Sequence, residues 1–168
     1  MNIFWTDECP QQCSRALDSL RVNKMILETA QLLSTAHHSW GSGTPLMYKV
    51  THVNHPCAKW VRAAEDNYRW AFEHLVYLIT EHTYRTHNAH STARLIRVLE
   101  VPPAGIPVGS TDRPNCSLYK DLPLVQAYRK TMLSKWDNDV NRPKFHQRGL
   151  PNWAFDATWK GQPLWRNS

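Results

Sequence analysis

The apolar residues of the N-terminal third of the chain recur with the period of an α-helix. Over residues 21–36 they stand three and four positions apart, which places them on one face of a helix. These residues are Val22, Met25, Ile26, Thr29, Leu32, Leu33 and Ala36. The helix is expected to begin near Pro10, with Asp7 as its N-cap, and to run to about His38 with a break near 18–20.

The same periodicity predicts three further helices. Pro56 suits the first turn of a second helix, which continues to about Arg85. Its expected inward-facing residues are Trp60, Val61, Ala64, Tyr68, Phe72, Leu75, Leu78 and Ile79. Ser91 is expected to cap a short third helix through Leu99. Asp121 is expected to cap a last one, from Leu122 to Trp136.

The regions around the last helix lack this pattern. Residues 101–123 hold five prolines and two glycines, which indicates an ordered excursion or a flexible flap. Residues 137–168 are rich in aromatic and basic residues but show little helical period and no β alternation. The sequence therefore predicts an all-α fold, a compact single-domain helical bundle over 1–168 with an irregular aromatic and basic C-terminal arm.

Composition limits the class of protein. A chain of 168 residues with 42% hydrophobic and 20% charged residues is long enough for one folded domain. No apolar run approaches 18 residues, so no membrane span is expected. The N-terminus lacks the features of a signal peptide, which favours a cytoplasmic protein. The four cysteines are then expected to be reduced and structural.

Net charge suggests the kind of partner. The chain carries a formal charge of +6 and a pI near 9.3. A basic surface favours a polyanion, and DNA or RNA is the usual one.

Glu28 is the single acid in the stretch 21–36. Beside the apolar stripe runs a second one, made of Arg21, Lys24, Glu28, Gln31 and Thr35. A carboxylate at this seam is half desolvated and has cations one turn away, as a general acid or base requires. The alternative is a Lys24–Glu28 ion pair on a solvated helix face.

Nine histidines raise the question of a metal site. His52, His55 and Cys57 are close in sequence, but their spacing fits no established zinc pattern. We therefore expect no metal and no cofactor. Loop histidines that open a basic helix are better suited to donate hydrogen bonds to phosphate or to a base edge, beside helix amides that attract anions.

The C-terminal arm interleaves aromatic and basic residues. The segment 145–153 includes Arg148 and Trp153, and such a pattern suits stacking on exposed bases while cations bind phosphates. The alternative is that Trp153 and Phe155 dock the arm on the core.

Several motifs occur in a recognisable order. They are Met1-Asn-Ile-Phe-Trp5, Leu27-Glu-Thr-Ala-Gln31, Tyr48-Lys-x-Thr-His-x-Asn-His-Pro56, Glu81-His-Thr-Tyr-Arg85 followed by His87, and Arg148-Gly-Leu-Pro-Asn-Trp153. Together they resemble the pyrimidine-dimer DNA glycosylase (endonuclease V-like) family, in a branch common among phage-encoded proteins. The resemblance covers about 1–90 and 145–155.

This resemblance implies an all-helical enzyme that bends double-stranded DNA and attacks the sugar C1′ of a damaged pyrimidine with its N-terminal α-amine. Glu28 falls at the catalytic glutamate of the family. Met1 and Asn2 complete the implied catalytic set. Because Met is not readily removed before Asn, the free amine belongs to Met1 or is out of place.

The implied DNA contacts come from two stretches of the chain and from the arm. They are Arg21, Lys24, Gln31, Lys49, His52, Asn54, His55, Lys59, Arg62, Arg148 and Trp153. We expect a monomer that acts in the cytoplasm, in a phage-infected bacterial cell if the resemblance holds.

Two alternatives to an N-glycosylase, with or without lyase activity, remain. The first is a phage transferase that attaches an amine or another group to a modified pyrimidine, with a small-molecule co-substrate in a pocket roofed by residues 101–123. The second is a non-catalytic nucleic-acid-binding module.

Overall fold

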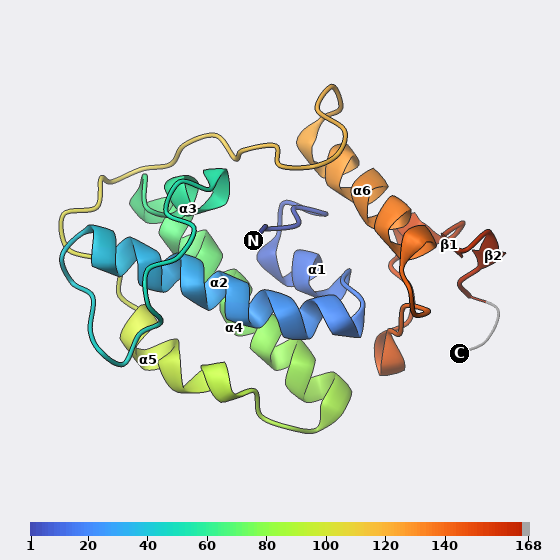
Figure 1. The fold of residues 1–168 in the computed structure, drawn as a ribbon, viewed down its shortest axis with the longest axis horizontal. Helices are drawn as coiled ribbons and strands as arrows, with labels where there is room; N and C mark the ends of the chain where they lie inside the picture. Colours follow the sequence, from blue (N-terminus) through green and yellow to red (C-terminus); the bar gives the residue numbers. More distant parts are fainter. Residues whose placement is uncertain (166–168) are drawn as a thin grey trace.

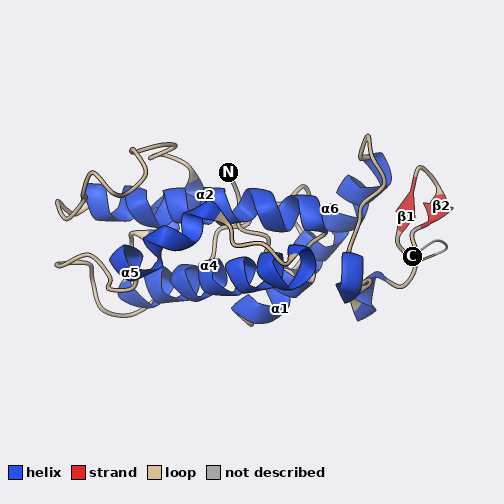
Figure 2. Ribbon diagram, turned by 90° about the horizontal axis from the view of Figure 1, so that it is seen from below, coloured by secondary structure: helices blue, strands red, loops and turns tan. Residues whose placement is uncertain are grey.

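Two long helices, α2 (Ser19–Ser39) and α4 (Glu65–Thr86), pack against each other at the centre of the molecule (Figures 1 and 2). The computed structural model describes residues 1–165 of the chain. The other helices are α1 (Pro10–Arg15), α3 (Pro56–Val61), the 3-10 helix η1 (Ser91–Leu95), α5 (Ile96–Leu99) and α6 (Leu124–Asn138). The all-α expectation is confirmed.

The first predicted helix is two helices, and the break lies at residues 16–18, slightly before the predicted 18–20. Asp18 caps α2, because its carboxylate accepts a hydrogen bond from the backbone N–H of Arg21 at 3.1 Å. The prediction that Asp7 is the N-cap of the first helix is wrong. Cys9 holds that position in α1, and Asp7 instead accepts from the Cys9 backbone N–H.

The second predicted helix is also divided, which the sequence did not predict. Ala64 is extended, so α3 ends before it and α4 begins after it. The backbone N–H groups of Glu65 and Asp66 donate to the carbonyls of Pro107 and Gly109. Residues 101–123 therefore form an ordered excursion that satisfies the free amides at the start of α4.

Two further predicted N-caps are wrong. His90, not Ser91, caps η1, because its ring nitrogen accepts from the backbone N–H of Thr92. The last helix begins at Leu124, with Pro123 rather than Asp121 in the N-cap position. Ser91 and Asp121 belong to residue types that commonly cap helices, but neither occupies the N-cap position here.

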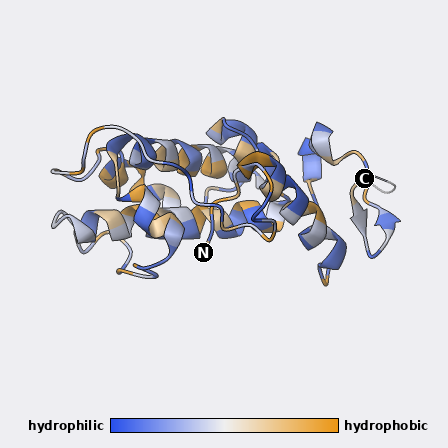
Figure 3. Ribbon diagram, turned by 90° about the horizontal axis from the view of Figure 1, so that it is seen from above, coloured by the Kyte–Doolittle hydropathy of each residue, from blue (hydrophilic) through white to orange (hydrophobic). Residues whose placement is uncertain are grey.

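The core joins the N-terminal segment to the helices. Trp5 is fully buried, and its indole packs edge-on against Trp60 and Tyr128, with centroids 5.3 and 5.5 Å apart. The predicted apolar faces of α2 and α4 are buried, apart from Phe72, which is partly buried. Figure 3 shows apolar and polar positions alternating around the long helices.

The C-terminal arm is irregular, as predicted. It contains the 3-10 helices η2 (His146–Arg148) and η3 (Asn152–Ala154) and the two-residue strands β1 (Thr158–Trp159) and β2 (Gln162–Pro163), which pair antiparallel. Positions 166–168 of the predicted arm lie outside the described residues. Within 1–165, no helix is both long and apolar enough to cross a membrane.

Candidate active site

The carboxylate of Glu28 meets the beginning of the chain. The Met1 amine nitrogen lies 3.5 Å from Glu28 Oε2, and the Asn2 backbone N–H donates to the same oxygen at 3.1 Å. On the other side, Lys24 Nζ lies 3.7 Å from Oε1. The Lys24 pair expected from helical spacing is present. However, the Glu28 side chain is 13% exposed, so this is not a freely solvated helix face.

Residues 3–5 hold the amine in place. Ile3, Phe4 and Trp5 are buried, so the segment is anchored directly after the first two residues. The Asn2 side chain adds a second attachment, because its Oδ1 accepts from the Tyr128 hydroxyl at 3.1 Å and from the Cys57 thiol at 3.6 Å. Asn2 thus links Glu28 on α2 to α6 and α3.

His55 stands beside this group as the N-cap of α3. Its Nδ1 accepts from the backbone N–H of Cys57 at 3.2 Å. Burial lowers the pKa of His55, and the positive charges of the N-terminal amine and of His52 lower it further, against the opposing effect of Glu28. Because Nδ1 accepts a hydrogen bond, the neutral ring carries its proton on Nε2, which can donate.

Exposed polar side chains lie on the elements that adjoin Glu28. Lys24 is 66% exposed on α2. Lys49, His52 and Asn54 are exposed in the loop before α3, and Lys59 is exposed on α3 itself. All five side chains lie at the surface, where Lys24 pairs with Glu28 and His52 Nδ1 is hydrogen-bonded to Thr51 Oγ1 at 2.6 Å.

Other predicted DNA contacts are less available. The Arg21 guanidinium makes two bonds of 2.8 Å to Asp139 and one of 2.6 Å to Asp18, and its side chain is 12% exposed. Gln31 and Arg62 are half-buried, on α2 and at the end of α3.

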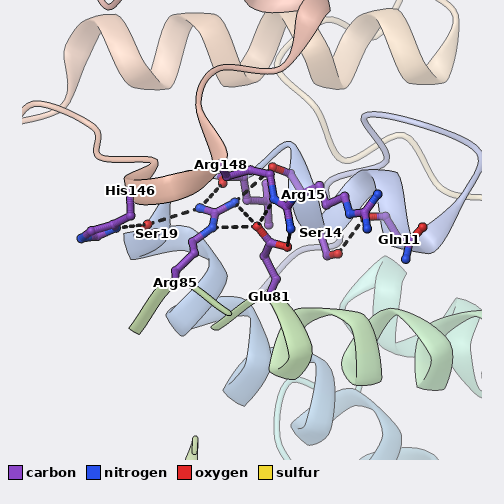
Figure 4. Close-up of polar contacts among 9 residues, drawn as sticks. Gln11, Ser14, Arg15, Ser19, Glu81, Arg85, His146 and Arg148 are labelled. Carbon is purple, nitrogen blue, oxygen red and sulfur yellow. Dashed lines mark hydrogen bonds and ion pairs between the residues drawn. The ribbon is translucent and has the colours of Figure 1, made fainter. Parts of the chain in front are cut away.

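The two arm residues are engaged with α4 and α6 rather than with Glu28. Arg148 donates to both Glu81 oxygens, at 2.8 and 2.9 Å (Figure 4). Its guanidinium also lies over the Tyr84 ring. Trp153 stacks on Trp136, with centroids 5.6 Å apart and ring planes at 11°. For Trp153 the docking alternative is therefore the observed one, whereas Phe155 is 79% exposed and does not dock.

The residues around the Asn2 side chain were not predicted from the sequence. Cys57 follows the Asn54-His55-Pro56 motif directly, and this adjacency was the available signal. Tyr128 and Cys116 carried no such signal, since both reach the site only through tertiary packing: the Cys116 backbone N–H donates to the Tyr128 hydroxyl at 3.0 Å.

The chain matches no protein-family model, no curated protein and no solved structure. Among residues 1–165, no group of three or more His, Cys, Asp and Glu side chains is arranged to hold a metal ion.

Proposed function

We propose that this chain is a DNA-binding enzyme that acts on a damaged or modified pyrimidine as an N-glycosylase, with the Met1 amine as nucleophile and Glu28 as its acid–base partner. The observation that carries the proposal is the 3.5 Å separation of the Met1 nitrogen from Glu28 Oε2. An amine beside a half-buried carboxylate is the pair that imine-forming chemistry needs. The order of sequence motifs adds support.

The chemistry uses both groups. The neutral form of the amine is the nucleophile. The lone pair of the Met1 nitrogen attacks C1′, and the bond from C1′ to the base breaks as the base leaves with a proton. The C1′–O4′ bond then opens while the nitrogen loses its protons, which produces a Schiff base. Glu28 accepts a proton from the nitrogen and delivers one to O4′.

Exposed lysines support DNA as the substrate. Lys24, Lys49 and Lys59 are exposed on α2, the following loop and α3, in a chain of net charge +6. Cations so placed bind phosphates without reading sequence. A base or its partner must leave the stack before C1′ is reached, so a lesion that weakens stacking favours the reaction.

Borohydride trapping tests the proposal. The protein is incubated with a duplex that carries a thymine dimer or an abasic site, reduced, and analysed by denaturing gel and peptide mass spectrometry. Covalent attachment of DNA to the nitrogen of residue 1 is the expected result. Intact-mass measurement first establishes that Met1 carries the free amine, and protein acetylated at that amine is the control.

Absence of an adduct, with DNA binding intact, would overturn the amine mechanism. The second candidate is then a transferase that adds a small molecule to a pyrimidine. It is favoured by a groove of about 490 Å³ beneath residues 110–113, lined by Trp60, Asn67 and Trp70 among others. A binding module differs from both enzymes, because substitution of Glu28 would leave all its properties intact.

A further inference from the structure

Two thiols lie against each other next to Asn2. The sulfur of Cys57, in the first turn of α3, lies 3.9 Å from the sulfur of Cys116 and 3.6 Å from Asn2 Oδ1, so its single S–H is shared between these two acceptors. Cys116 belongs to the ordered segment 101–123, so 59 residues separate the partners in sequence. Cys57 is buried and Cys116 is half-buried. A purely structural role, as expected for all four cysteines, does not explain why these two thiols lie in contact.

The pKa values of the two thiols are shifted in opposite directions. Donation of the Cys57 S–H lowers the pKa of Cys116, and the positive charges of Lys120 and of the N-terminal amine lower it further, against the effect of burial. The same hydrogen bond, together with burial, raises the pKa of Cys57. The half-buried Cys116 sulfur is the one that a peroxide can reach, and the buried Cys57 sulfur lies 3.9 Å from it, which is the arrangement of an attacking and a resolving cysteine.

We propose that Cys57 and Cys116 form a redox-active dithiol that a hydroperoxide oxidises to a disulfide. The Cys116 thiolate attacks the terminal peroxide oxygen, and the O–O bond breaks. This step produces a sulfenic acid and, after protonation, water or an alcohol. The Cys57 sulfur then attacks the Cys116 sulfur, and the sulfenic hydroxyl leaves with the Cys57 proton as a second water. The two thiols supply the two electrons that the peroxide takes up.

Bond formation requires a small movement. A disulfide bond is close to 2.05 Å long, so the sulfurs approach by about 2 Å. Cys57 is fixed in a helical turn, where its backbone N–H donates to His55. Cys116 lies outside the helices and is tied through its backbone N–H to the Tyr128 hydroxyl. Cys116 is therefore the residue expected to move when the bond forms.

Oxidation has a consequence at the N-terminus, and this part rests on the proposed function. The Cys57 S–H, which Asn2 Oδ1 shares with Cys116, disappears in the disulfide. Asn2 keeps its bond from Tyr128 but loses one of two side-chain attachments. The oxidised protein should hold the Met1 amine against Glu28 less firmly, and should trap DNA with a lower yield.

The test uses the full chain with Cys9→Ser, since Cys9 is exposed and would cross-link separate molecules. The protein is treated with hydrogen peroxide, alkylated and digested. We expect the intact mass to lose two hydrogen atoms and one disulfide-linked peptide pair to join Cys57 to Cys116, both reversed by dithiothreitol. Free alkylation of both cysteines after peroxide, or two oxygens added to Cys116 without a disulfide, would overturn the proposal.

Two variants in the same background separate the roles. With Cys57→Ser, Cys116 should stop at the sulfenic acid and react with dimedone. With Cys116→Ser, Cys57 should remain a thiol, and equal dimedone labelling of the two variants would contradict the assigned roles. The mass measurement on Cys9→Ser protein needs neither variant to fold and no DNA. It therefore decides the thiol chemistry even if borohydride trapping fails in the reduced protein, which would count against the proposed function alone.

Discussion

The backbone N–H of Asn2 donates a hydrogen bond of 3.1 Å to the carboxylate of Glu28, across 26 residues of sequence. Because the donor is a main-chain group, this contact does not depend on the side chain at position 2. The Asn2 side chain faces Tyr128 and Cys57 instead. The position of the Met1 amine and the anchoring of the segment can therefore be tested by separate substitutions.

Glu28→Gln should lower the yield and rate of borohydride trapping by at least about 100-fold, since general acid–base catalysis contributes about 10²–10⁴-fold. DNA affinity should be unchanged or higher because a negative charge is lost. Glu73→Gln, which removes the same charge from an exposed position on α4, is the matched control. Full turnover by Glu28→Gln with normal DNA binding would contradict the assigned role.

Asn2→Leu keeps a large residue at position 2, so that Met1 is retained; it should keep the backbone contact with Glu28 but leave the Tyr128 hydroxyl without its acceptor. We expect a loss of about 1 kcal/mol in the free energy of unfolding and slower trapping. Tyr128→Phe removes the other side of the same bond. In a double-mutant cycle the two losses should be less than additive, measured by urea unfolding and by trapping rates. Strict additivity would mean that the two side chains act independently.

His74 should make the fold sensitive to acid. The side chain is buried, its ring N–H donates to the Pro10 carbonyl, and burial lowers the pKa of His74 to about 4. The unfolded chain, with a pKa near 6.5, binds the proton more readily than the folded one. The stabilisation is therefore complete above pH 6.5 and is lost as the pH falls to about 4, by roughly 2–3 kcal/mol.

Urea unfolding of the wild type and of His74→Gln at pH 7, 5.5 and 4 checks this dependence. Gln keeps a donor for Pro10 but does not titrate. The curve of stability against pH should be flatter in the variant over this range. Identical curves would assign the acid sensitivity to other groups.

Glu81→Gln should destabilise the protein by about 3 kcal/mol, because it leaves Arg85 buried without its carboxylate. Arg85 is 1% exposed and also donates to the carbonyls of Leu17 and Arg15. Burial alone would raise the pKa of Glu81, but the Arg148 and Arg85 guanidinium groups outweigh it and the pKa is lowered.

Arg148→Ala is the matched comparison for that cluster. Its guanidinium is 28% exposed, and Glu81 keeps Arg85 when Arg148 is removed. We expect a smaller loss of stability than with Glu81→Gln, together with faster proteolysis of the arm after Phe145. An equal loss from both substitutions, by urea unfolding, would show that Arg85 does not hold Glu81 by itself.

DNA binding should depend on salt through three exposed lysines, Lys24, Lys49 and Lys59. Each of Lys24→Ala, Lys49→Ala and Lys59→Ala should reduce the slope of log affinity against log salt by about 1, which fluorescence anisotropy measures. Arg97→Ala, exposed on α5, removes the same charge elsewhere and should leave the slope unchanged. A uniform decrease in all four variants would indicate a general charge effect.

Local sequence patterns were sufficient to predict the helices and the Lys24 side of the candidate site. The three- and four-residue spacing predicted α2, its buried face and the position of Glu28 beside Lys24, because neighbours on a helix are set by its 3.6-residue turn. The break before α2 and the irregular arm followed from equally local signals. The division between α3 and α4 did not, because the Pro107 and Gly109 carbonyls that receive the α4 amides lie some forty residues further along the chain.

Tertiary packing decided which charges and thiols have partners. Arg21 and Arg148 look like free cations in the sequence, but Asp139 and Glu81 neutralise them over more than sixty residues. The meeting of the Met1 amine with Glu28, and of Cys57 with Cys116, has the same origin. No local spacing encodes such contacts, because they depend on how the buried aromatic residues around Trp5 bring α2, α3 and α6 to the first two residues of the chain.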